Sequence, residues 1–337
     1  MSHATDHEGN MSTSPIYPEN ALILAPLSGF TDLPYRRAAR RCGCRFAFTE
    51  MVDAASLACS PDRAALLLRR GEDEEFLGAQ IVGADPEFVR RAADEINRYE
   101  FDLVDFNLGC PVPKVTRKGA GAALGRNLEL AKRDFGILAE RCRFPLTVKM
   151  RIVAETDPAP SVELARAMVE LGARAVTVHG RTLEGFYSGT MHPEIIRAIR
   201  EALPPEIPVI ANGGVRDRAT YGALKCASGV SRVMLAQGAM GNPWFFRQLA
   251  EGKDVPPTVD EWKALIREHV SGMVDLYGEE SAMRQARKIV HDYLKGRGFP
   301  AAARAEASAL AVFDDLDRLL DKLRPAPGAI ASRPLAF

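Results

Sequence analysis

Two hydrophobic patterns alternate along the first three quarters of the chain. Short apolar runs rich in β-branched residues indicate buried strands, and the longer segments between them carry apolar residues at helical spacing. The strand-like runs lie at 21–25, 46–49, 77–81, 103–106, 146–150, 175–179, 208–211 and 233–236. Strand followed by helix, repeated eight times, predicts an α/β fold of the (β/α)8 TIM-barrel type, and we place this catalytic barrel at residues 21–252.

The pattern changes after Gly252. The Pro256-Pro257 pair marks a linker, Asp260 is a candidate helix cap, and residues 258–324 show helical spacing with little strand signal. We therefore expect a small all-helical C-terminal domain. The polar residues 1–20 are predicted to be a disordered lead-in, and residues 325–337 a flexible tail.

An open, doubly wound sheet is the competing architecture. Its best supporting string is Gly119-Ala120-Gly121-Ala122-Ala123-Leu124, which resembles a dinucleotide-binding turn. However, Leu124 stands where the third glycine belongs, and the string follows a polar segment rather than a strand. The closed barrel is therefore the better prediction.

Composition narrows the function classes. No apolar run among the 337 residues approaches the roughly 18 residues of a membrane span, so we expect a soluble protein without membrane contact. The six cysteines are dispersed without metal-ligand spacing, which predicts reduced thiols, a cytoplasmic location and no metal. The net charge is zero, so any binding of nucleic acid must depend on a local basic patch.

Polar side chains cluster at the predicted carboxyl ends of the strands, where barrels build their active sites. They include Gln80, Asn107, Lys149, His179 and Arg181. Gln80 is either a paired core amide or a contact to the edge of a ligand ring. Lys149 belongs either to a structural ion pair or to the site of an anionic ligand. His179 alone would more often be structural, but its place at a strand end beside Gly180-Arg181 favours a functional role.

Two glycine-rich loops follow the last two predicted strands. Asn212-Gly213-Gly214 follows the seventh strand and residues 238–242 follow the eighth, which are the places where such barrels bind phosphate through backbone N–H groups. Either loop alone is readily explained as a tight turn. Together with Lys149 and His179 they favour flavin mononucleotide (FMN), because cations would stabilise the negative charge of the reduced ring.

Cys110 lies in the turn Asn107-Leu108-Gly109-Cys110-Pro111, directly after a buried strand. A cysteine here is an inert buried thiol, a nucleophile or a general acid. No histidine adjoins it in sequence to indicate a Cys/His nucleophile. A thiol with an ordinary pKa near 8.5 stays protonated at neutral pH, which favours the general acid.

These segments and several others resemble the tRNA-dihydrouridine synthases. The similarity covers the barrel nearly end to end, with the motifs in family order. The motifs are APLSGFTD at 25–32, TEM at 49–51, NLGCP at 107–111, VKMR at 148–151, VHGRT at 178–182, NGG at 212–214 and GNPW at 241–244.

The resemblance implies an FMN enzyme in which NADPH, or NADH, reduces the flavin. Hydride then passes from flavin N5 to C6 of a uridine in tRNA, while Cys110 protonates C5. Asn107 would hold the uracil, and Arg181 is a further candidate for substrate binding. By position, the cofactor-binding candidates are Pro26, Leu27, Ser28, Gln80, Lys149, His179, Asn212, Gly213 and Gly214, to which we add Ala236 and Gln237.

The chain departs from the family pattern at three places. The family usually has Gly-Arg where this chain has Ala236-Gln237, so backbone N–H groups or another cation must hold more of the phosphate. Leu108 replaces a methionine, which is a mild apolar exchange. Ile289 and Asp292 replace the usual His and Trp of the helical domain.

A tRNA substrate requires the target base to leave its stack, at a cost that contacts to the RNA backbone must offset. Arg284, Lys288 and Lys295, with His291, follow helical spacing and are candidates for a basic stripe that makes such contacts, although a solvated helix face explains the spacing equally well. Two other functions remain open: a small-molecule FMN reductase of the dihydropyrimidine dehydrogenase type, and a non-catalytic RNA-binding protein. We expect a monomer.

Overall fold

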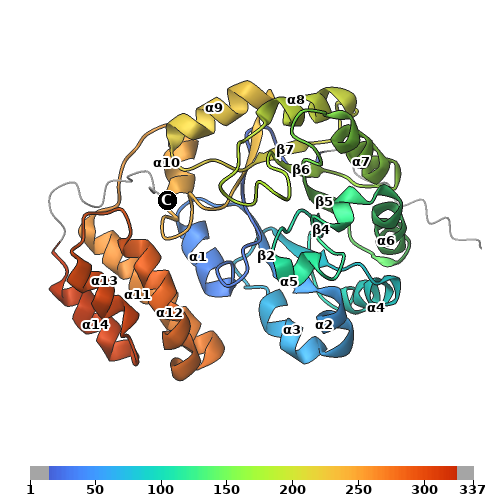
Figure 1. Cartoon of the computed structure of the whole chain (residues 1–337). Coiled ribbons are helices and arrows are strands. Elements are labelled where there is room, and N and C mark those ends of the chain that lie inside the picture. Colours follow the sequence, from blue (N-terminus) through green and yellow to red (C-terminus); the bar gives the residue numbers. More distant parts are fainter. Residues whose placement is uncertain (1–14, 325–337) are drawn as a thin grey trace, which may run out of the picture.

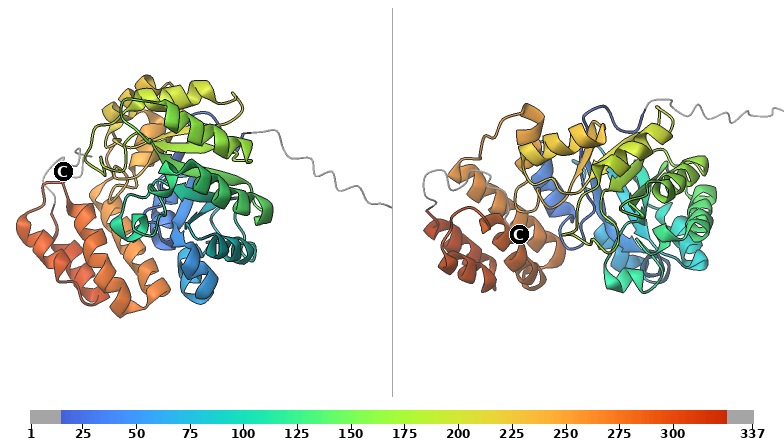
Figure 2. Two further views of the ribbon diagram at one scale, coloured as in Figure 1. Left: turned by 45° about the vertical axis from the view of Figure 1, so that its right-hand side comes forward. Right: turned by 45° about the horizontal axis from the view of Figure 1, so that its top comes forward.

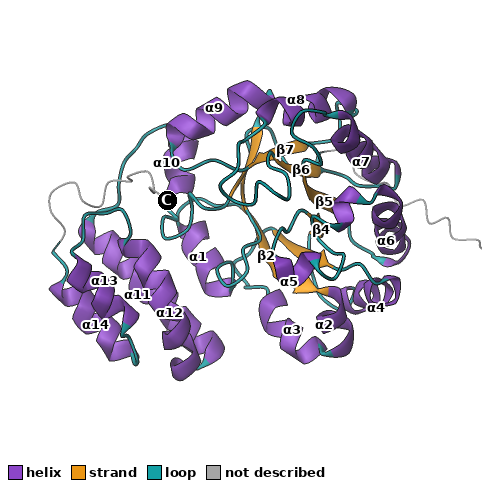
Figure 3. Cartoon of the chain, viewed as in Figure 1, coloured by secondary structure: helices purple, strands orange, loops and turns teal. Residues whose placement is uncertain are grey.

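Eight parallel strands form a closed barrel in the order β1 to β8 (Figures 1 and 3). The computed structural model describes residues 15–324. The strands are β1 Leu22–Leu24, β2 Phe46–Asp53, β3 Leu77–Val82, β4 Leu103–Leu108, β5 Leu146–Arg151, β6 Val176–His179, β7 Val209–Asn212 and β8 Arg232–Leu235. Hydrogen-bonded pairing of β1 with both β2 and β8 closes the barrel. The predicted fold class is confirmed.

Helices surround the barrel and continue into a helical C-terminal region. Those that precede the linker are α1 Leu33–Arg41, α2 Ala54–Cys59, α3 Pro61–Leu68, α4 Pro86–Ile96, α5 Pro113–Thr116, α6 Leu128–Arg141, α7 Ala159–Glu170, α8 Pro193–Ala202, α9 Arg218–Ser228 and α10 Phe245–Glu251. A short 3-10 turn, Leu124–Arg126, precedes α6. The helices after the linker are α11 Val259–Tyr277, α12 Glu279–Leu294, α13 Ala301–Ser308 and α14 Phe313–Lys322.

Alternation along each strand sorts its side chains into two cores. In β4, Val104 and Phe106 pack outward with the surrounding helices, whereas Leu103 packs inward with apolar residues of the other strands. Because side chains alternate faces along a strand, Asp105 and Asn107 share the inward face of Leu103. Polar residues two and four positions after an inward apolar residue therefore line the upper interior of the barrel.

The C-terminal helices lie to one side of the barrel (Figure 2). With Ala38 of α1 they form an apolar core of their own. Trp262 of α11 and Tyr293 of α12 are fully buried in it. The helix after the linker, α11, begins at Val259 behind the N-cap residue Thr258. The Thr258 hydroxyl accepts from the Glu261 N–H, and the Glu261 carboxylate accepts from the Thr258 N–H. The prediction that Asp260 caps this helix is therefore wrong, because this reciprocal capping box starts the helix two residues earlier.

The segment before β1 also differs from its prediction. Residues 15–20 were included in the disordered lead-in, but Tyr17 is only 2% exposed and its ring packs against Phe46 and Phe76. Arg232 donates to the Tyr17 carbonyl oxygen. These contacts order residues 15–20; the rest of the predicted lead-in and the predicted tail at 325–337 lie outside the described residues. Within residues 15–324, no helix is long and apolar enough to cross a membrane.

Candidate active site

Polar side chains from adjacent strands meet at the carboxyl ends of β4 to β7. In the strand register, Asn107 lies opposite Lys149, Arg151 opposite His179, and His179 opposite Asn212. The parallel register thus forms two successive rows in the barrel wall. Asn107 and Lys149 belong to one row, and Arg151, His179 and Asn212 belong to the next. The site is therefore built by the sheet itself and not only by loops.

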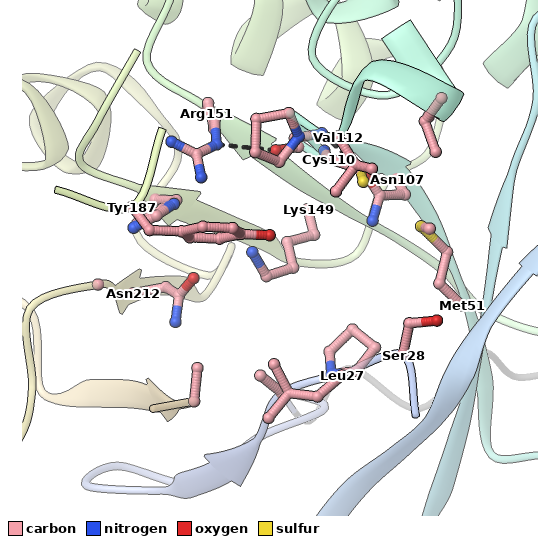
Figure 4. Close-up of a pocket in the computed structure, with 18 of the residues that line it drawn as sticks. Leu27, Ser28, Met51, Asn107, Cys110, Val112, Lys149, Arg151, Tyr187 and Asn212 are labelled. Atoms are coloured by element: carbon pink, nitrogen blue, oxygen red, sulfur yellow. Dashed lines mark hydrogen bonds between the residues drawn. The ribbon is translucent and has the colours of Figure 1, made fainter. Parts of the chain in front are cut away.

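These side chains line a cavity of about 590 Å³, within the usual size range of small-molecule sites. In Figure 4, Lys149 reaches toward the middle, with Asn107 and Cys110 on one side, Asn212 on another, and Leu27 and Ser28 opposite. The sequence-predicted residues that line the cavity are Pro26, Leu27, Ser28, Asn107, Cys110, Lys149, His179, Arg181, Asn212, Gly213, Gly214, Ala236 and Gln237.

The Cys110 turn is held from both sides. The Asn107 Oδ1 atom accepts from the backbone N–H groups of Gly109 and Cys110, at 2.9 and 2.8 Å. The Cys110 carbonyl accepts from the Ala122 N–H at 3.0 Å, and a Cβ on Gly121 would lie 2.7 Å from that carbonyl oxygen. The glycine string at 119–124, which we rejected as a nucleotide-binding turn, thus supports the cysteine loop.

Burial raises the pKa of the Cys110 thiol, against smaller opposing effects of the Val112 N–H, Lys149 and Arg151. The thiol therefore remains protonated at neutral pH while it lines the cavity. A protonated thiol at a cavity wall is a proton donor and a poor nucleophile. This geometry supports a general acid.

Gln80 lies below the cavity and is 1% exposed. Its amide nitrogen donates to Asp105 Oδ2 at 2.7 Å, and its amide oxygen accepts from the Asn107 side chain at 2.8 Å. Thr147 donates to the other oxygen of Asp105. Within residues 15–324, Gln80 is not among the residues that line the cavity. Its hydrogen bonds are those of a paired core amide, and a contact between Gln80 and a flavin stays a prediction.

The two cations of β5, Lys149 and Arg151, differ in how readily they lose a proton. Burial and the neighbouring Arg151 lower the pKa of Lys149 to about 8, while Asp105 opposes this effect. Arg151 is 3% exposed and donates to the carbonyl oxygens of Gly109 and Thr182, both at 2.9 Å. Lys149 is thus the more readily titrated cation in the cavity.

His179 is neutral at pH 7, because burial and the nearby cations hold its pKa well below the usual value. Its Nε2 atom lies 3.4 Å from a guanidinium nitrogen of Arg181. Since a guanidinium only donates, Nε2 is the acceptor and the imidazole proton resides on Nδ1. Arg181 is itself 8% exposed and lines the cavity.

The turn after β7 needs its glycines. Gly213 and Gly214 have φ values of +108° and +71°, and a Cβ on Gly213 would lie 2.3 Å from the His179 ring. A Cβ on Gly238 would lie 2.7 Å from the Val215 carbonyl oxygen, so the loops after β7 and β8 pack backbone against backbone. Two such loops beside Lys149 and Arg181 form a cradle suited to a phosphate-bearing anion.

The three basic residues predicted for RNA binding lie outside the cavity: Arg284 and Lys288 on α12, and Lys295 at its C-cap. Arg284 forms an exposed ion pair with Glu280, and Lys295 is partly buried. The Lys288 ammonium lies 3.4 Å from the centre of the Phe30 ring, and Phe30 lines the cavity. The face of α12 that carries Lys288 therefore borders the cavity mouth.

Sequence reasoning missed several residues of the site. Asp105 was overlooked, although the alternation that places Asn107 inside the barrel also places Asp105 there. Burial raises the pKa of Asp105 to about 6. Tyr187 and Lys118 line the cavity from loops, and Lys114 from the single-turn helix α5, where no strand or helix periodicity signals which way a side chain points.

The fold and site together define a class of protein: a TIM-barrel enzyme with a cationic cradle for a phosphate-bearing anion and a protonated thiol nearby. Among residues 15–324, no cluster of three or more histidine, cysteine, aspartate or glutamate side chains is arranged to hold a metal ion.

Comparisons with known proteins identify the family. The model for dihydrouridine synthase (Dus) matches residues 23–326. The chain is 32% identical to tRNA-dihydrouridine synthase B of Shewanella oneidensis, over 84% of this chain and 89% of that protein. It is 34% identical to the Pseudomonas aeruginosa protein of the same name, over 82% and 84%. It is 33% identical to a probable tRNA-dihydrouridine synthase of Rickettsia prowazekii, over 84% and 87%.

The chain therefore belongs to the dihydrouridine synthase family, as its motifs predicted. A solved structure, histamine dehydrogenase from Rhizobium sp. 4-9, matches with a TM-score of 0.51 at 13% identity. That match covers 74% of this chain and 48% of the other, and it shows likeness of fold alone.

Proposed function

We propose that this enzyme reduces specific uridines in tRNA to 5,6-dihydrouridine, with FMN as its flavin. The observation that carries the proposal is the position of Cys110. Its protonated thiol lines the same cavity as the glycine turn 212–214 and the cations Lys149 and Arg181. A proton donor and an anion cradle in one cavity suit flavin-linked reduction of a carbon–carbon double bond.

The residues present fit FMN. Gly213 and Gly214 line the cavity with backbone alone, in a turn whose positive φ values and close contact with His179 exclude a Cβ. Lys149 and Arg181 supply positive charge for the phosphate and the ring. Gln237, in the place of the family's usual arginine, also lines the cavity. When bound and reduced by NADPH or NADH, FMN would supply the hydride for uracil C6.

In this proposal Cys110 gives its proton to C5 of the uracil. Asn107 fixes the turn through its Oδ1 atom and gives one side-chain N–H to Gln80, and we assign its second N–H to a uracil carbonyl. Arg181 contributes a cation to the same substrate region. Arg151 ties the Gly109 carbonyl to the loop that begins at Thr182, which holds the cysteine turn in place beside the cavity.

The RNA binds across the cavity mouth and the adjoining face of α12. Lys288 borders the mouth through Phe30, Arg284 extends the basic stripe along the helix, and Lys295 continues it at the C-cap. Contacts of these side chains with phosphates offset the cost of flipping the uridine into the cavity. The proposal also includes action as a monomer in the cytoplasm.

The test is an assay of the purified protein with tRNA from a strain that lacks the gene. We expect NADPH-dependent formation of dihydrouridine, detected by nucleoside mass spectrometry as a gain of two hydrogens, with nuclease mapping of the position. Free uridine and uracil serve as control substrates. Their turnover without turnover of tRNA would instead favour a small-molecule reductase, and tRNA binding by a flavin-free protein would favour a non-catalytic role.

A further inference from the structure

The loop between β6 and α8 carries two exposed aromatic rings beside the cavity. Phe186 is 39% exposed and Tyr187 is 43% exposed, and their ring centres lie 4.4 Å apart at an interplanar angle of 67°. Tyr187 lines the cavity, whereas Phe186 does not. The Tyr187 ring thus faces the interior (Figure 4). Phe186 packs edge-on against that ring, exposed to solvent and outside the cavity lining.

Phe186 is held in a backbone conformation that a bulky residue rarely adopts. Its φ is +44°, in the left-handed region that disfavours large side chains. The loop is closed by a hydrogen bond from the Gly189 N–H to the Gly185 carbonyl, and a Cβ on Gly189 would lie 2.5 Å from Gly185 Cα. The surrounding structure therefore fixes this ring in an exposed position despite the local cost.

Arg151 braces the loop from below. Its guanidinium donates to the Phe186 carbonyl at 2.6 Å and to the Thr182 carbonyl at 2.9 Å, and it also donates to the Gly109 carbonyl next to Cys110. One buried cation thus connects the turn that carries the thiol to the loop that carries the exposed rings. The backbone of Phe186 is thereby tied to the turn that carries Cys110.

The rim across the barrel from the rings carries a net positive charge. Lys114, Lys118 and Asp53 line the cavity there, and Lys118 pairs with Asp53 at 3.1 Å. Val112, 37% exposed, adds apolar surface beside them. Flat rings on one side and ammonium groups on the other match single-stranded nucleic acid, whose bases stack on aromatic side chains while its phosphates pair with cations.

We propose that Phe186 is a stacking platform for the base adjacent to the uridine that enters the cavity. This inference rests on the proposed function, because it requires an RNA strand that delivers one flipped base. Tyr187 contacts the base inside the cavity, and Phe186 receives the neighbouring base outside it. The platform supports substrate binding and takes no part in proton transfer.

The test compares Phe186→Asn with Phe186→Trp. Asparagine tolerates a positive φ, so the first variant removes the ring without new backbone strain; tryptophan keeps a stacking surface. Leu130→Asn on α6 is the matched control, because Leu130 is also 39% exposed but does not line the cavity. Kd and KM are measured for tRNA from a strain lacking the gene, together with kcat and bound flavin.

We expect Phe186→Asn to raise Kd and KM for this tRNA about tenfold, the effect of losing one base–aromatic stack. Its kcat at saturating tRNA and its flavin content should stay within about twofold of the parent protein, as should all values for Phe186→Trp and Leu130→Asn, by the same stacking argument.

Unchanged tRNA binding in Phe186→Asn, or equal weakening in both Phe186 variants, would overturn the platform while leaving the proposed function intact. A parent protein that neither binds nor reduces tRNA would overturn both proposals.

Discussion

Two groups of cations in this enzyme occupy opposite environments. Lys149 and Arg151 lie inside the barrel, where burial lowers their pKa values to about 8 and about 10. Arg284 and Lys288 lie on α12 beside carboxylates: Arg284 pairs with Glu280, and Glu50 and Asp292 act on Lys288. Buried cations bind a small anion strongly because little solvent screens them, whereas surface cations bind a polyanion weakly and in a salt-dependent way.

The comparison also separates residues that build the site from residues that meet the substrate. Inside the barrel, Asp105, Gln80 and Asn107 hold one another and, through Asn107, the Cys110 turn. On α12, each basic side chain projects from a helix that the bundle core already stabilises. A change inside the barrel should therefore affect folding and chemistry together, and a change on α12 should affect RNA affinity alone.

The largest effect is expected from Gln80→Leu. It leaves Asp105 Oδ2 and the Asn107 amide without their buried partner, which should lower the free energy of unfolding by about 2–4 kcal/mol. Urea denaturation measures the change. Gln285→Leu, at an exposed position of α12, is the control and should cost no more than about 0.5 kcal/mol. Equal stability of the two variants would show that the network does not hold the site together.

A tenfold effect is expected from the titration of Lys149. Its ammonium is charged at pH 7 and loses its proton as the pH rises through about 8, and an anionic ligand favours the charged form. The charged fraction of Lys149 in the free protein falls about tenfold between pH 7 and pH 9. The Kd for FMN should therefore rise about tenfold over the same range.

Fluorescence titration of the apoprotein with FMN tests this expectation. Lys149→Met should bind FMN more weakly at pH 7 and show a flat profile up to pH 9. Lys132→Met, which removes an exposed cation of α6, should retain the parent profile. A Lys149→Met profile that still rises would assign the pH dependence to another group.

The smallest effect is expected on α12. Lys288→Glu should weaken tRNA binding about threefold at physiological salt, with little loss of flavin. The slope of log affinity against log salt concentration should fall by roughly one, which corresponds to one phosphate contact. Lys322→Glu on α14, an exposed cation paired with Glu306, is the control. Filter binding across a salt series provides the measurement, and unchanged RNA affinity of Lys288→Glu would remove the basic stripe from the proposal.

Much of the fold could be predicted because period-two and helical spacing are strong signals over a whole barrel. Lys149, His179 and Asn212 could be predicted to share one cavity, because the carboxyl ends of all the strands lie at the same end of a barrel. The strand predicted at 46–49 continues to Asp53 through an irregularity between Phe48 and Met51, which interrupts the alternation that marks a strand.

Other features depend on packing that no local pattern encodes. The partner of Gln80 is Asp105, 25 residues away, and only the register of β3 with β4 brings the two together. Helical spacing placed Lys288 on a face of α12, but the position of that helix against Phe30 is set by the bundle core. Phe186 and Tyr187 lie in a loop whose conformation is determined by Arg151 and the Gly185–Gly189 contact.

The role of Cys110 is the central claim, and a single-turnover experiment tests it most directly. Parent protein and Cys110→Ala, each with its flavin fully reduced by NADPH, are mixed with tRNA that lacks dihydrouridine, and reoxidation of the flavin is followed without oxygen. The account predicts equal flavin content, equal reduction by NADPH and a loss of at least about 100-fold in reoxidation by tRNA for Cys110→Ala. Reoxidation at the parent rate would contradict it, because the proton for C5 would then come from another group.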